Sequence, residues 1–189
     1  MKNLSNQIYF AKVNESAIIP SKREEDGAFD LYANFKEDYM VIKPHETKMI
    51  PTGIASAFSS DYVAILKERG SNGSKGIGQR AGVIDSGFRG EWQVPLTNHN
   101  ELPVVIIKNS DKYSANHYSY RGKVISTKLY DGIKEFDFEG EVILYPYEKA
   151  ICQCIMVEVP KLKIEEIAYD ELLKFESERG TGMLGSSGK

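Results

Sequence analysis

The sequence predicts an all-β protein, and three observations support this class. Short apolar or alternating runs rich in Tyr, Val, Ile, Phe and Thr recur along the 189 residues, and these residue types favour pleated strands. Gly, Pro, Asn and Asp bound the runs, as turns require. A helical pattern is confined to one short stretch near the C-terminus. Many short strands without intervening helices are typical of an antiparallel sandwich or barrel.

The strands are expected, in chain order, within QIYFAKV, YMVIKP, TKMIPTGIASAF, YVAILKE, EWQVPLTN, PVVIIKN, GKVISTKLY, EVILY and AICQCIMVEV. A short C-terminal helix is expected near residues 169–175, where Leu172 and Phe175 share a face. Residues 176–189 are rich in Gly and Ser and have few bulky side chains. We therefore expect a flexible tail there, suited to act as a lid over an anionic ligand.

Charge and hydropathy restrict the class of partner. Lys and Arg number 24 against 27 Asp and Glu, which gives a net charge of −3. This balance argues against a protein that coats nucleic acid or an anionic membrane. The apolar runs fall far short of the roughly 20 residues that a membrane helix needs, and the first ten residues lack the apolar stretch of a signal peptide. The sequence predicts a single cytoplasmic domain over residues 1–189, with no direct nucleic-acid or membrane partner.

The cysteines and histidines do not form a metal motif. Cys152 and Cys154 are two residues apart, so in a strand both side chains point to the same face. Free cysteines are commonly buried, and we interpret this pair as core packing. The histidines at 45, 99 and 117 are scattered. Zinc and Ser-His-Asp chemistry therefore have no support in this sequence.

Two Gly- and Ser-rich segments have the composition of a phosphate-binding loop. RGSNGSKG begins at Arg69 and RGTGMLGSSGK begins at Arg179. Backbone N–H groups exposed by small residues can surround phosphate oxygens, and an arginine can bind two of them at once. Neither segment fits the Walker pattern GxxxxGK[ST]. Each is also compatible with a simple flexible loop.

The segment GVIDSGFRGEW, residues 82–92, is more specific. Two apolar residues lead into Asp-Ser-Gly, which predicts a β-hairpin with its turn at Ser86 and Gly87. Asp85 is either a turn residue that bonds its own backbone or a carboxylate that orients and deprotonates a water. Phe88 lies beside it and could pack against a sugar or a base.

The order of EDGAFDLYA, ERGSNGSKG, GVIDSGFRGE, AICQ and RGTGMLGSSG resembles the five motifs of the trimeric dUTPases. The match runs from about residue 10 to the C-terminus. This resemblance implies a jelly-roll-like (β-clip) fold and a homotrimer whose active sites lie between subunits. It also implies hydrolysis of dUTP to dUMP and pyrophosphate with Mg²⁺, which limits uracil incorporation into DNA.

The resemblance also implies a role for each motif. Asp85 would activate the water that attacks the α phosphorus, and Gln153 would help to hold that water. Asp30 would contact the magnesium ion through its bound waters. Phe88, in place of the usual Tyr, would press on the deoxyribose and leave no room for a 2′-hydroxyl. The implied substrate-binding residues are Arg69, Gly70, Ser71, Gln79, Gly82, Val83, Ile84, Phe88, Arg179, Leu184, Gly185 and Ser186.

The chain departs from the family pattern in several places. Gly70 intervenes before Ser71, so either Ser71 or Ser74 would hold the phosphate. Leu184 stands where the family has a Phe that stacks on uracil. Residues 148–150, Glu-Lys-Ala, replace the usual Gly-Asp-Arg before Gln153.

The interval between Asp85 and Gln153 is longer than in the plain family form, and the excess falls in residues 100–140. This inserted β segment is either a tolerated surface addition or a protein-binding one, for which Tyr113, Tyr118, Tyr120 and Tyr130 are suited. Two alternative functions share the fold. One is a dCTP deaminase, and the other is a regulatory protein that uses nucleotide occupancy as a switch through the insertion.

Overall fold

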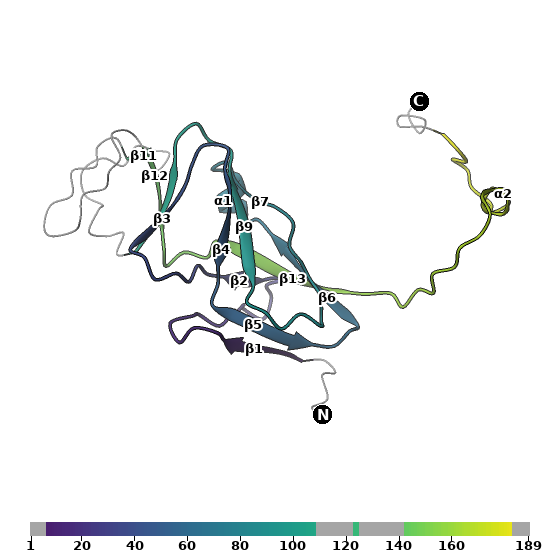
Figure 1. Ribbon diagram of the computed structural model, residues 1–189, viewed down its shortest axis with the longest axis horizontal. Coiled ribbons are helices and arrows are strands. Elements are labelled where there is room, and N and C mark those ends of the chain that lie inside the picture. Colours follow the sequence, from purple (N-terminus) through teal and green to yellow (C-terminus); the bar gives the residue numbers. More distant parts are fainter. Residues whose placement is uncertain (1–6, 109–122, 125–141, 183–189) are drawn as a thin grey trace, which may run out of the picture. The chain divides into compact units, whose positions relative to one another are not determined.

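A computed structural model describes residues 7–108, 123–124 and 142–182. These residues form thirteen strands and two four-residue helices (Figure 1). The strands are β1 (Ile8–Lys12), β2 (Phe29–Leu31), β3 (Tyr39–Ile42), β4 (Thr47–Pro51), β5 (Ile54–Phe58), β6 (Tyr62–Lys67), β7 (Ile77–Gln79), β8 (Val83–Ile84), β9 (Gln93–Asn98), β10 (Val104–Ile107), β11 (Lys123–Val124), β12 (Val142–Pro146) and β13 (Cys152–Glu158). The helices are α1 (Gly70–Gly73) and α2 (Tyr169–Leu172). The predicted all-β class and the short helix near residue 169 are confirmed.

The strands form four sheets, with the orders β1-β5, β11-β12-β10-β3, β2-β13-β6-β8 and β4-β9-β7. Neighbouring strands are antiparallel except β10 and β12, which are parallel. Parallel strands cannot be joined by a tight turn and need a crossover of a dozen residues or more. The long connection between Ile107 and Val142 meets this requirement. The sequence did not predict this parallel pair.

The core lies between the sheets and is made from the inward-facing residues of most strands. Trp92 is fully buried and its ring meets Phe10 edge-on, with 5.6 Å between ring centroids. The largest buried side chains around it are Leu31, Ile42, Ile50, Ile54, Leu66, Ile77, Ile106 and Ile151. Strand β13 shows the expected alternation, because Cys152 and Cys154 are buried while Gln153 between them is only half-buried. Burial raises the pKa of both thiols to about 12, so they are inert packing groups at neutral pH.

The chain divides into two compact units, residues 1–159 and residues 160–189. The first contains all of the strands. The second contains α2, none of whose residues is buried within it. Neither helix in the described ranges has the length or apolarity needed to cross a bilayer.

Candidate functional site

A row of polar residues crosses the outward face of the β2-β13-β6-β8 sheet. Gln153 on β13 lies directly opposite Asp30 on β2 and Lys67 on β6. Residues paired in this way share a face, and the buried Cys152 and Cys154 define the other face as inward. The Gln153 amide donates a hydrogen bond to the Glu68 carbonyl at 3.1 Å. The strand register alone therefore brings Asp30 and Gln153 together.

The Arg69 guanidinium joins this row. Its Nε and Nη2 atoms lie 3.1 Å and 3.3 Å from the two carboxylate oxygens of Asp30, so the pair is bidentate. Its Nη1 donates to the Ala150 carbonyl at 3.1 Å. Three contacts from one planar group hold the arginine in a single orientation at the end of β6.

The segment after Arg69 forms a turn of helix, α1, and not the flexible loop that its composition also allowed. The N–H groups of Asn72 and Gly73 bond the Arg69 carbonyl, and that of Ser74 bonds the Gly70 carbonyl. The first N–H groups of a helical turn, here those of Gly70 and Ser71, have no acceptor within it. Ser71 lines the adjacent cavity, whereas Ser74 Oγ bonds back to the Ser71 carbonyl at 3.3 Å. Of these two serines, Ser71 is the one that lines the cavity.

An open cavity of about 920 Å³ lies over this arrangement. Predicted site residues from three separate motifs line it, namely Asp30, Arg69, Gly70, Ser71 and Gln153. The remaining lining residues are Ser21, Lys22, Arg23, Asp26, Gly27, Ala28, Tyr32 and Ile155.

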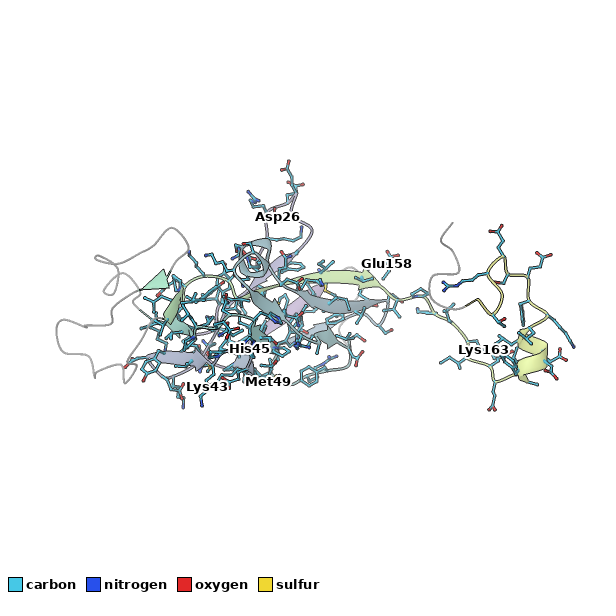
Figure 2. All side chains as sticks on the ribbon, turned by 90° about the horizontal axis from the view of Figure 1, so that it is seen from above. Asp26, Lys43, His45, Met49, Glu158 and Lys163 are labelled. Atoms are coloured by element: carbon cyan, nitrogen blue, oxygen red, sulfur yellow. The ribbon has the colours of Figure 1, made fainter. Side chains whose placement is uncertain are left out.

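The loop before β2 also lines this cavity, and its residues Lys22 and Arg23 were not predicted as site residues. Figure 2 labels Asp26, which stands out from the strands in that loop. Asp26 pairs with Arg23 through two bonds of 2.9 Å and 2.8 Å, and Lys22 donates to the Asp26 carbonyl at 2.7 Å. Because Asp26 offsets the charge of Arg23, the net positive charge of these three lining residues comes from Lys22. The consecutive basic residues Lys22 and Arg23, just before the first motif, are the sequence signal that could have indicated this part of the cavity.

The third motif begins with an unusual backbone. Ala81 and Gly82 both have positive φ, of 56° and 102°. The Gln79 side chain donates to the Arg80 and Ala81 carbonyls at 2.6 Å and 2.9 Å and so holds this bend. The Gly82 carbonyl accepts from Leu66 N at 2.8 Å, which starts the pairing of β8 with β6. The bend therefore leads from Gln79 on β7, an edge strand of the β4-β9-β7 sheet, to Val83 and Ile84 on β8, an edge strand of the β2-β13-β6-β8 sheet.

The predicted turn is present, but the predicted hairpin is wrong. Phe88 N donates to the Asp85 carbonyl at 3.0 Å, which closes a turn with Ser86 and Gly87 at its centre. The strands on either side of it do not pair with each other, because β8 pairs with β6 whereas β9 pairs with β4 and β7. Turn chemistry is local, whereas the choice of strand partner depends on long-range packing.

The Arg89 side chain holds the backbone of this turn. Arg89 Nη1 donates to the Ser86 carbonyl at 2.6 Å and the Phe88 carbonyl at 2.9 Å. The Phe88 ring lies so close to Gly90 that a Cβ there would approach the ring to 2.6 Å. Phe88 is nevertheless 44% exposed, and Asp85 is exposed beside it. The motif thus presents a carboxylate and one ring face at the surface.

Asp85 does not reach the cavity that Asp30 lines. β2 and β8 are the two edges of their sheet, three strand spacings or about 14 Å apart. Asp30 is level with Lys67 on β6, through Gln153, whereas Ile84 pairs with Ala64 on the same strand. The two residues are therefore also three positions apart along the strand direction. Together these place the Cα atoms of Asp30 and Ile84 roughly 17 Å apart, and Asp85 continues away from the cavity.

We expect Gly82→Ala to destabilise the protein. A Cβ at this position would lie 2.6 Å from Leu66 Cβ, and φ is +102°. Clash and backbone strain together should cost about 1–3 kcal/mol in the free energy of unfolding. Denaturant unfolding measures this, with Gly87→Ala as the matched control, because no atom lies within 4 Å of a Cβ built there. Equal midpoints for the two variants would contradict the assignment of strain to Gly82.

The fifth motif lies in the second unit. Arg179 is exposed, and its Nε donates to the Gly182 carbonyl at 3.4 Å. Leu184, Gly185 and Ser186 lie outside the described residues, as does most of the 100–140 insertion.

The chain resembles known proteins in both sequence and fold. The dUTPase family model matches residues 14–113. The chain is 30% identical over 182 residues to the deoxyuridine 5′-triphosphate nucleotidohydrolase of Nautilia profundicola, which covers 94% of this chain and 96% of that one. It is 35% identical over 101 residues to the Pol polyprotein of caprine arthritis encephalitis virus, covering 53% of this chain and 9% of the polyprotein.

Among solved structures, the dUTPase of Staphylococcus bacteriophage 80alpha with dUPNHPP has a TM-score of 0.69 at 20% identity, over 98% of this chain and 100% of that one. This likeness confirms the predicted dUTPase fold. Both the family model and the full-length bacterial relative point to one assignment: the chain belongs to the dUTPase family.

Proposed function

We propose that this protein hydrolyses dUTP to dUMP and pyrophosphate, which removes dUTP from the precursors of DNA. One observation carries the proposal. Asp30, Arg69, Ser71 and Gln153 come from three distant motifs and line a single cavity. The Nautilia relative named above, a deoxyuridine 5′-triphosphate nucleotidohydrolase, matches over nearly the whole chain and supports the same substrate.

The cavity suits the triphosphate. Arg69 and the N–H groups of Gly70 and Ser71 would bind phosphate oxygens, and Lys22 adds positive charge at the rim, where Asp26 offsets Arg23. Arg179 of the C-terminal unit is proposed to bind the outermost phosphate, with Leu184, Gly185 and Ser186 closing over the nucleotide. Residues 176–189 would act as a lid over the site of a neighbouring subunit.

The donor set fits a magnesium ion that arrives with the nucleotide. In the described ranges no group of three or more His, Cys, Asp or Glu could form a protein cage for a metal. Mg²⁺ commonly keeps several waters and is held by substrate phosphates and one or two carboxylates. Asp30 is the proposed carboxylate, acting through bound water. When bound, the ion would offset the charge of the triphosphate.

The chemical step needs a base. Water is a poor nucleophile, so a carboxylate aligned with the α phosphorus must take its proton. Asp85 is exposed at the end of β8 and is the residue proposed for this role, with Gln153 helping to hold the water. β8 is an edge strand, so one side of its backbone at Val83 and Ile84 is available to the uracil edge. Phe88 would pack on the deoxyribose and exclude a 2′-hydroxyl.

A homotrimer with shared sites accounts for the separation of the motifs. Magnesium near Asp30 and a water on Asp85 must both reach the same phosphate, yet the two residues lie at opposite edges of one sheet. Asp85 of one subunit would therefore complete the cavity of another. Beside the polar row, the outward face carries exposed apolar residues that suit a subunit contact, Val83, Ile155 and Val157.

The remaining assignments rest on composition. We propose that residues 1–189 form one dUTPase domain with residues 100–140 as an inserted β segment. The tyrosines of that insertion would offer a surface to a protein partner. The two free, buried cysteines suit a reducing cytoplasm.

The proposal predicts a narrow substrate range. With magnesium, dUTP should yield pyrophosphate, whereas dCTP, TTP and UTP should be cleaved at least about 100-fold more slowly because each meets a polar mismatch or a steric clash. Pyrophosphate release from each nucleotide is the measurement. Ammonia release from dCTP would instead identify the deaminase alternative, and equal cleavage of UTP would remove Phe88 from its role.

A further inference from the structure

A buried polar pair packs against α1, the helical turn that begins with Gly70 and Ser71, and has no part in the proposed chemical step. Asn72 is 2% exposed and Tyr145 is 5% exposed. Asn72 belongs to α1, and Tyr145 belongs to β12, a strand of a different sheet from the one that carries Asp30 and Gln153.

Each polar atom of the pair is used. The Tyr145 hydroxyl lies 2.9 Å from Asn72 Oδ1 and 2.6 Å from the Ala150 carbonyl, two acceptors between which its single proton is shared. The Asn72 amide donates to the Ile151 carbonyl at 2.8 Å. The Ala150 carbonyl also accepts the Arg69 guanidinium. One hydroxyl thus connects the turn to the two residues that lead into β13 and, through Ala150, to Arg69.

The hydroxyl remains a donor at neutral pH. Burial raises the pKa of Tyr145 above its usual value of 10, and the hydrogen bond with Asn72 only partly offsets this. Loss of the hydroxyl would deprive two buried acceptors, Asn72 Oδ1 and the Ala150 carbonyl, of the one tyrosine proton that they share, which favours movement of the turn.

The turn cannot hold its own position. It has four residues, and the Arg69 side chain makes no capping hydrogen bond to it. A single helical turn fixes several backbone dihedrals for very few hydrogen bonds, so it is unstable without tertiary contacts. Asn72 is the buried residue of α1 and therefore its anchor.

We propose that Tyr145 and Asn72 are positioning residues, which hold Gly70 and Ser71 where their N–H groups meet the phosphates. This inference rests on the proposed function. It assigns a role in phosphate affinity to a strand that contributes no residue to the cavity lining.

The test is Tyr145→Phe, which removes one oxygen and keeps the ring. Affinity for a non-cleavable dUTP analogue should fall about 5- to 20-fold, whereas the inhibition constant of deoxyuridine, which has no phosphates, should change less than twofold. In steady-state hydrolysis the KM should rise in the same proportion, with kcat within about threefold of wild type.

Tyr147→Phe is the matched control. Tyr147 follows the end of β12 and is half-buried, and its hydroxyl interacts with the Phe35 backbone, away from the turn. The Tyr147→Phe variant should bind the analogue with wild-type affinity. A second variant, Asn72→Ala, should reproduce the selective loss, and the double variant should lose less than the sum of the two single losses because each single substitution already removes the bond between the two side chains.

The outcomes separate the two proposals. If the wild-type protein neither binds the analogue nor cleaves dUTP, the proposed function fails and this inference fails with it. If wild type binds but Tyr145→Phe retains full affinity, or loses affinity for the analogue and deoxyuridine equally, only the positioning role is overturned. Additive losses in the double variant would overturn it as well.

Discussion

Asp85→Asn should abolish nearly all dUTP hydrolysis while leaving nucleotide binding intact. The amide matches the carboxylate in size, so the turn closed by the Asp85 carbonyl and Phe88 N is preserved. What is lost is the proton acceptor for the attacking water, and removal of a general base typically lowers kcat by about 10²–10⁴-fold. Single-turnover hydrolysis and binding of a non-cleavable dUTP analogue measure the two effects separately.

Asp38→Asn is the control for this substitution, because Asp38 is exposed in the turn before β3 and lies outside the cavity lining. It should hydrolyse dUTP at the wild-type rate. Near-normal turnover by Asp85→Asn would show that another group accepts the proton. Loss of analogue binding in Asp85→Asn would show that Asp85 holds the nucleotide and is not the base.

Local patterns in the sequence predicted most strands and the orientation of the cysteines. Period-2 alternation in AICQCIMVEV placed Cys152 and Cys154 on the inward face, and both are fully buried. Asp-Ser-Gly likewise predicted a turn that is present. Such features depend on a few neighbouring residues, whose backbone preferences the sequence displays directly.

The strand partners could not be predicted in the same way. The hairpin expected across Ser86 failed because β8 pairs with β6, twenty residues before it, while β9 enters another sheet. The parallel β10–β12 pair was missed for the same reason. Pairing is decided by the fit of whole sheets around the core, and no local spacing encodes that fit.

The candidate site likewise combines residues that the sequence identified with residues that only the packed fold reveals. Spacing alone did not bring Asp30 and Gln153 together; their motifs were identified through the family resemblance, and the β2–β13 register then explains their proximity. Asn72 and Tyr145 were missed altogether. Asn72 lies in a Gly- and Ser-rich segment, and Tyr145 lies in an ordinary apolar strand 73 residues away. Their contact exists only once β12 is packed beneath the turn.

Two inactive variants should restore activity to each other when their subunits are mixed. Arg69→Ala removes the guanidinium that binds Asp30 and lines the cavity, and Asp85→Asn removes the proposed base at the other edge of the sheet. If each site takes Arg69 from one subunit and Asp85 from another, a site can still draw both intact residues. Random assembly from equal amounts should make about a quarter of the sites complete.

The measurement is dUTP hydrolysis after the two variants are denatured together, mixed and refolded, compared with each variant refolded alone. Wild type refolded in the same way defines full activity, and an equal mixture of wild type and Asp85→Asn should recover about half of that activity. A site built within one chain would give no recovery in the mixture of the two inactive variants, because every chain would lack one of its two residues. Recovery near a quarter therefore requires a shared site. We expect this result because Asp30 and Ile84 lie roughly 17 Å apart in one chain, which is too far for that chain to place both the metal-bound waters and the base at a single phosphorus.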